Sequence, residues 1–221
     1  MLKINLHSFY KKYLVNSNNF RIFASEVKID KMNKLLLVID CQYDFINGSL
    51  AVKGAGPTMD RLAEFIKENG ASYKKIVLTA DWHPLTHCSF KDNGGTWPKH
   101  CVQYTQGAAI YQPIIDTLDT IKSDYTVLTK GKIEDHEEYS IFKNNISKNI
   151  IVNTCNTLEI TDIDVVGIAY DYCVACSVKD GMRHFPNVNF RIYKDLCPYI
   201  AQDTADNFTN YIKSTERVCL V

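Results

Sequence analysis

Short apolar runs that end in a charged side chain are the feature that most constrains this fold. Residues 35–39 form an unbroken apolar run followed by Asp40, and residues 76–80 lead in the same way into Asp81. A strand that is apolar on both faces must be covered on both faces, which is typical of a parallel sheet between helical layers. The other predicted strands are 125–129, 163–169 and, with weaker patterns, 190–193 and 217–221.

Helical spacing appears between these strands. Apolar residues repeat on one helix face over residues 59–66, with Thr58 as the expected N-cap and Gly70 as the expected stop. Further helices are predicted near residues 172–184 and 205–212. Strands that alternate with helices predict a three-layer α/β/α fold, which resembles a Rossmann fold, with a mostly parallel six-stranded sheet.

The length of 221 residues suits one large domain, which we place at residues 35–221. Residues 1–34 form an N-terminal extension. Up to Ser25 this extension has four basic residues and no acid, which suits an organelle transit peptide as well as a polar arm. Basic and acidic residues both number 25, so no charge excess points to nucleic acid. With no apolar run near the roughly 20 residues that span a bilayer, we expect a soluble, cytoplasmic protein without a membrane partner.

The eight cysteines could indicate a disulfide framework, but that pattern suits short secreted chains that lack a core. Because the strands supply a core here, we expect reduced cysteines that mostly act as small core residues. Cys173 and Cys176 also form a CxxC pair, which keeps open a metal or redox module without catalysis. No second pair at matching spacing accompanies it.

Five reactive side chains lie at the ends of predicted strands or at the start of the next helix. Ligands of open parallel sheets bind beyond the carboxyl ends of the strands, so these residues are expected to converge there. They are Asp40, Asp81, His83, Lys130 and Cys173. A cysteine at a helix N-terminus beside an ammonium group is expected to have a lowered thiol pKa and to act as a nucleophile. Asp40 could carry its proton to a leaving group.

Histidines are concentrated in residues 79–90, TADWHPLTHCSF, and in the WPKHC segment that follows. Asp81 and His83 can point the same way from a strand end, and His87 and His100 can fold back from the long loop. Three imidazoles and a carboxylate predict a site for one divalent metal ion, with zinc as the first choice and iron or manganese as alternatives.

Five motifs, in order, resemble those of the nicotinamidases within the isochorismatase-like cysteine hydrolases. They are LLLVIDCQYDFINGSLAV, TADWHPLTHCSF, GTWPKHCVQYTQGA, TKG and VVGIAYDYCV, and the resemblance covers residues 35–221. DWH, WPKHC and Lys130 together favour the nicotinamidases over the isochorismatases. The resemblance implies deamidation of nicotinamide, a small-molecule partner, to nicotinate and ammonia through a cysteine thioester, as in NAD salvage.

The resemblance also implies roles for individual residues. The implied catalytic triad is Asp40, Lys130 and Cys173. The implied metal ligands are Asp81, His83 and His87, with His100 as a further ligand or a close neighbour. A non-proline cis peptide between Ile168 and Ala169 would aim the amides of Ala169 and Cys173 at one point as an oxyanion hole. The implied substrate contacts are Phe45 and Trp97, on either side of the pyridine ring, and Tyr139 at the pocket mouth.

Two positions depart from the family pattern. Tyr172 replaces the histidine that usually precedes the nucleophile, and Ile141 replaces a glycine and is expected to change the edge of the pocket. Both bear on the choice of substrate more than on the reaction type. A related amidohydrolase that acts on a carbamoyl or ureido substrate therefore remains an alternative, although such a substrate has no ring nitrogen to anchor. The oligomeric state is left open, a homo-oligomer included.

Overall fold

The computed structural model describes residues 32–221. Six strands form one sheet in the order β3-β2-β1-β4-β5-β6, and every neighbouring pair is parallel, which confirms the predicted fold class. The strands are β1 (Met32–Ile39), β2 (Tyr73–Asp81), β3 (Tyr125–Lys130), β4 (Asp162–Gly167), β5 (Asn189–Ile192) and β6 (Val218–Leu220). β1 begins at Met32, within the segment that we assigned to the N-terminal extension. The rest of that extension lies outside the described residues.

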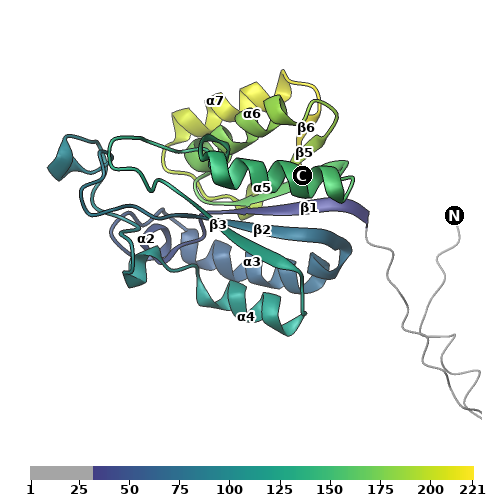
Figure 1. Ribbon diagram of the computed structural model, residues 1–221, viewed down its shortest axis with the longest axis horizontal. Coiled ribbons are helices and arrows are strands. Elements are labelled where there is room, and N and C mark those ends of the chain that lie inside the picture. Colours follow the sequence, from purple (N-terminus) through teal and green to yellow (C-terminus); the bar gives the residue numbers. More distant parts are fainter. Residues whose placement is uncertain (1–31) are drawn as a thin grey trace, which may run out of the picture.

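Helices cover both faces of the sheet, so the molecule has the three expected layers (Figure 1). One face carries α3 (Ala55–Asn69) and α4 (Gln112–Thr120), and the other carries α5 (Asn145–Thr157), α6 (Ala175–His184) and α7 (Gln202–Lys213). A short helix, α2 (Tyr43–Ile46), follows the carboxyl end of β1. Within the described part of the chain, no helix is both long enough and apolar enough to cross a membrane.

Each face of the sheet has its own hydrophobic core, and alternate side chains of β1 divide between the two. Leu35, Leu37 and Ile39 pack on the side of α5, α6 and α7, whereas Leu36 and Val38 pack on the side of α3 and α4. All five are buried. A register slip of one residue would exchange the two sets, so the pattern holds β1 in place. The position of Asp40 at the end of β1 is held with it.

Several boundaries differ from the prediction. Thr58 was the wrong N-cap, because α3 already begins at Ala55 after Gly54, whose φ of 78° turns the chain into the helix. Gly70 ends the helix as expected. Helices α4 and α5 were not predicted. The sequence of α5 is rich in Asn, Thr and Ile, which are weak helix formers, but the Asn144 side chain caps it by accepting a hydrogen bond from the Ser147 amide (3.1 Å).

All eight cysteines are free thiols, and five of them are buried. This agrees with the expectation that they act mainly as small core residues. Cys176, in the first turn of α6, is partly buried.

Candidate active site

Four side chains meet at the carboxyl edge of the sheet, as the order of the strands predicts. Asp40 follows β1, and Asp81 and Lys130 end β2 and β3, where they are register partners. Cys173 lies in a helical turn, Tyr170–Val174, that begins shortly after β4 and runs into α6. All four side chains are buried.

Lys130 is the centre of this group. Its ammonium nitrogen lies 2.9 Å from Oδ2 of Asp40 and 3.6 Å from Sγ of Cys173. It also makes a short ion pair with Oδ1 of Asp81. One buried cation therefore contacts both carboxylates and the thiol, and its charge reduces the repulsion between the two acids.

Burial acts on the pKa values of these groups in opposite directions. It would lower the pKa of Lys130, but Asp40, Asp81 and Cys173 outweigh it and hold that pKa well above its usual value. Burial raises the pKa of Asp40 despite the attraction of Lys130. Burial likewise raises the pKa of the Cys173 thiol well above its usual value, again against Lys130. The lowered thiol pKa expected from the sequence was therefore wrong, because burial outweighs the ammonium group. To act as a nucleophile, a neutral Cys173 would have to give up its proton.

Two buried polar residues that the sequence analysis missed hold the acids in place. The Thr79 hydroxyl donates to Oδ1 of Asp40 (2.6 Å). The Gln42 amide group donates to the backbone carbonyls of Asp81 and Ala108 (both 2.8 Å) and accepts from the Asp81 amide (2.7 Å). A polar residue inside or just after an apolar run was the only signal that the sequence offered for either.

Asp81, His83 and His100 form a donor set of the kind that can hold a metal ion, with one ligand atom of each lying within 4.8 Å of the others. Nδ1 of His83 lies 2.9 Å from the Gly131 carbonyl, and Nδ1 of His100 lies 2.8 Å from the Pro98 carbonyl. A proton on each Nδ1 leaves each Nε2 with a free lone pair, the arrangement of a histidine that binds a metal. The three residues fit a divalent ion such as zinc.

His87 is placed differently from the other three candidates. Its ring packs against that of His83 with the centroids 4.1 Å apart. Its Nδ1 accepts from the Ser89 amide, and its Nε2 faces the His136 carbonyl, both at 3.2 Å. Within residues 32–221, His100 rather than His87 completes the cluster of three donors. His87 would have to give up one of these hydrogen bonds to become a ligand.

Gly131 connects Lys130 to this cluster. It has a φ of 65°, and a Cβ at this position would lie 2.3 Å from Cε1 of His83, so only glycine fits. Its amide donates to Oε2 of the buried Glu138 (2.7 Å), another residue that the sequence analysis missed. The TKG motif thus supplies both the ammonium group and the carbonyl that orients His83.

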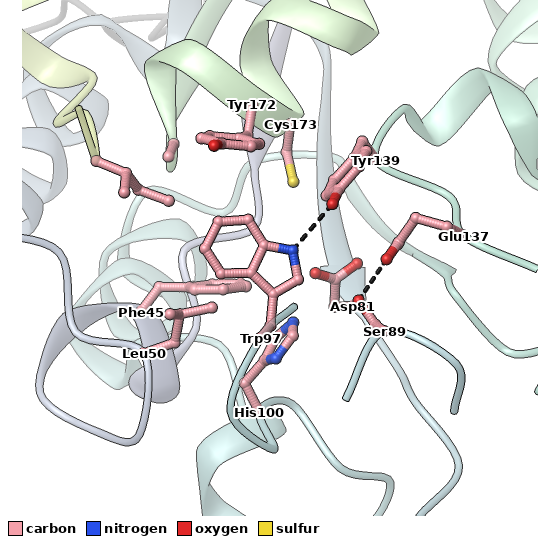
Figure 2. A pocket seen from close by; sticks show the side chains of 12 residues that line it. Phe45, Leu50, Asp81, Ser89, Trp97, His100, Glu137, Tyr139, Tyr172 and Cys173 are labelled. Carbon is pink, nitrogen blue, oxygen red and sulfur yellow. Dashed lines mark hydrogen bonds between the residues drawn. The ribbon is translucent and has the colours of Figure 1, made fainter. Parts of the chain in front are cut away.

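A small pocket opens beside the thiol (Figure 2). Its lining includes the predicted Phe45, Trp97, Tyr139 and Ala169, together with Leu50, Ser89, Glu137, Tyr172 and Ile200, for which the sequence offered no signal beyond the departure at residue 172. The Trp97 indole lies across the middle of the pocket, and its Nε1 donates to the Tyr139 hydroxyl (2.9 Å). The indole packs edge-on against Tyr172 with a centroid distance of 5.2 Å, whereas Phe45 lies 5.5 Å from His100.

Two further expectations concern the backbone and the pocket edge. The peptide bond between Ile168 and Ala169 is cis, as expected. Within the described residues, the amide of Ala169 has no hydrogen-bond partner and remains free to donate to a ligand. Ile141 does not line the pocket. It is fully buried in the core beside α5 and α6, so the expected effect on the pocket edge was wrong.

The sequence of residues 34–220 matches the protein-family model of the isochorismatase domain. The chain belongs to the isochorismatase family.

Members of the isochorismatase family that resemble this chain include enzymes named for amide hydrolysis. A nicotinamidase/pyrazinamidase of Mycobacterium tuberculosis is 32% identical over 77% of this chain and 89% of its own length. The solved structure of a protein from L. infantum in complex with nicotinate has a TM-score of 0.75 and 28% identity, and it covers 86% of this chain and 94% of its own. A pyrazinamidase of Pyrococcus horikoshii in complex with zinc has a TM-score of 0.72 and 26% identity, covering 86% and 99%. The resemblance inferred from the motifs is confirmed, and this isochorismatase-family chain is an enzyme of the nicotinamidase group.

Proposed function

We propose that this protein deamidates nicotinamide to nicotinate and ammonia, with Cys173 as the nucleophile and a divalent metal ion, zinc first, as the cofactor. The observation that carries the proposal is the contact of one buried ammonium group, that of Lys130, with Asp40, Asp81 and Cys173. A nucleophile, a proton carrier and a donor set for a metal thereby lie together, and Cys173, Asp81 and His100 of this group line one pocket. The names and bound molecules of the relatives support the same substrate class.

The first half of the proposed reaction forms a thioester. Asp40 accepts the thiol proton while Sγ of Cys173 attacks the carboxamide carbon. The negative charge that develops on the carbonyl oxygen is stabilised by the amides of Ala169 and Cys173. Asp40 then gives the proton to the nitrogen, the C–N bond breaks, and ammonia leaves.

The second half releases the acid. Asp40 takes a proton from a water molecule that attacks the thioester carbon. The C–S bond breaks, the sulfur regains its proton from Asp40, and the product leaves as the acid, which loses its proton to solvent to give nicotinate. Lys130 stays protonated throughout and stabilises the negative charge as it moves between sulfur and carboxylate. The nicotinate can then be used for NAD salvage.

The metal would be held by Asp81, His83 and His100, with His87 beside them. When bound, a divalent ion would supply a Lewis acid for the pyridine nitrogen, and a ring anchored in this way would present its carboxamide to Cys173. Phe45, Trp97 and Tyr139 line the pocket. Once the indole moves aside, Phe45 and Trp97 would contact the two faces of the ring, and Tyr139 would lie at the pocket mouth. The carbamoyl and ureido alternatives lack the ring nitrogen that this donor set would anchor.

The test is to follow ammonia release from nicotinamide by the purified protein. Turnover should stop after chelation and return when zinc, iron or manganese is added back. The Cys173→Ala variant should be inactive, whereas Cys176→Ala, one helical turn away, should remain active. An amide panel with a carbamoyl and a ureido compound accompanies the assay. Turnover of those compounds but not of nicotinamide would refute the proposal, as would full activity of Cys173→Ala.

A further inference from the structure

Thr79 is a buried hydroxyl that makes two hydrogen bonds to the proton carrier, and the mechanism above assigns it no role. It lies in β2, two residues before Asp81, and only 1% of its surface is exposed. Its Oγ1 accepts a hydrogen bond from the Asp40 amide (3.2 Å) and donates one to Oδ1 of the same residue (2.6 Å). The Asp40 amide also bonds to the Thr79 carbonyl (3.1 Å), so the two residues are joined at three places.

These contacts leave one carboxylate oxygen for chemistry. Because Oδ1 of an ionised Asp40 can only accept, the hydroxyl proton of Thr79 must point at it. Oδ2 lies 2.9 Å from the Lys130 ammonium, yet within the described residues it has no partner with hydrogen-bond geometry. A carboxylate oxygen of Asp40 lies within 4.8 Å of Sγ of Cys173. A partial rotation of the carboxylate away from this orientation would break the hydrogen bond to Thr79.

The backbone supports the same arrangement. Asp40 has a φ of 47°, in the left-handed region that Asp tolerates better than most residues. This conformation bends the chain out of β1 and brings the carboxylate beside the neighbouring strand, where Thr79 meets it. Asp40 is fully buried, so water does not compete for Oδ1.

We propose that Thr79 is a positioning residue for the hydrolysis: it holds Oδ1 of Asp40 so that Oδ2 faces the thiol and the leaving group. This inference rests on the proposed function, in which Asp40 carries the proton and has to be held in one orientation. A hydroxyl at this position is needed, and the methyl group of threonine is not. Serine should therefore replace threonine, whereas the isosteric valine should not.

The experiment compares Thr79→Val and Thr79→Ser in the full chain loaded with zinc. Thr79→Val should lower kcat for nicotinamide by roughly 10²-fold, the cost of a misplaced catalytic group, with KM changed by less than about twofold. Thr79→Ser should stay within about threefold of the wild type. Bound zinc per chain, measured by atomic emission, should be equal in all three. Should valine prevent folding, Thr79→Ala provides the same loss of the hydroxyl.

A second measurement does not depend on nicotinamide. Alkylation of Cys173 by iodoacetamide, followed by mass spectrometry of its peptide, should be slower in Thr79→Val than in the wild type and unchanged in Thr79→Ser. A wild type without nicotinamide turnover would refute the proposed function, while the alkylation rates would still test Thr79. The proposal would be overturned if Thr79→Val kept the kcat and the alkylation rate of the wild type. It would also be overturned if Thr79→Ser lost as much kcat as Thr79→Val, or if Thr79→Val lost its zinc.

Discussion

The backbone carbonyl of Gly131 lies 2.9 Å from Nδ1 of His83. This contact leaves Nε2 of His83 as the ring atom that can face a metal, and it comes from the residue next to Lys130 in the chain. The lysine and the histidine are therefore positioned by the same short turn after β3.

Replacing Gly131 by alanine should weaken metal binding. The new Cβ would lie 2.3 Å from Cε1 of His83, so the imidazole must move. We expect an affinity for zinc about 10- to 100-fold lower, the usual effect of disturbing a residue that orients a ligand. Competition with a chromogenic chelator measures it. Gly94→Ala is the matched control, because Gly94 also has a positive φ (89°) but open space around its Cα. Equal zinc affinities in the two variants would contradict the prediction.

Replacing Lys130 by methionine should destabilise the protein in a manner that depends on pH. Burial already raises the pKa of Asp40, and removal of the neighbouring cation raises it further. A carboxyl group with a raised pKa costs stability above its unfolded-state pKa, so the loss should be largest at neutral pH and shrink as the pH falls. Near pH 7 we expect a loss of about 3–5 kcal/mol in the free energy of unfolding.

Urea denaturation in the presence of a chelator, at neutral and at acidic pH, measures this effect. Lys67→Met on α3 is the control, because the Lys67 side chain is 60% exposed and its ion-pair partner, Glu64, is exposed too. That change should stay within about 0.5 kcal/mol. A loss in Lys130→Met that does not vary with pH would argue against an electrostatic role for the ammonium group.

Trp97 should report substrate binding directly. Its indole lies across the pocket and bonds to Tyr139, so a ring that enters must displace it. Nicotinamide added to the inactive Cys173→Ala variant should therefore change the tryptophan fluorescence in a saturable way. The chain has two tryptophans, and Trp97→Phe in the same background leaves Trp82 as the control. A fluorescence change of the same size in that double variant would show that Trp97 is not its source.

The thiol of Cys173 should behave as a neutral group in the free, metal-stripped protein. Because burial raises its pKa well above the usual value, the rate of alkylation should keep rising with pH beyond about 9. Cys219, which is exposed, is labelled in the same experiment as an accessible thiol for comparison. A rate at Cys173 that levels off below neutral pH would show instead a stable pair of thiolate and ammonium.

Much of this fold was predictable from local patterns. Apolar runs and helical repeats gave the strands and α3, and the rule that parallel strands share a carboxyl edge brought Asp40, Asp81 and Lys130 together before any coordinates. Helix α5 was missed because its weak helix formers are held by the Asn144 cap and by tertiary packing, neither of which is a periodic signal. Thr58 was misplaced because a glycine in the left-handed region can start a helix as well as a capping hydroxyl can.

The sequence by itself determined the architecture and the set of reactive side chains, because strand periodicity and strand ends are local properties of the chain. Tertiary structure alone decided that His100 rather than His87 joins Asp81 and His83, since loop residues are placed by contacts with distant segments. It also decided that the pKa of the Cys173 thiol is raised and that one hydroxyl from β2 holds Asp40. Both depend on burial, which is the sum of many packing contacts and has no motif of its own.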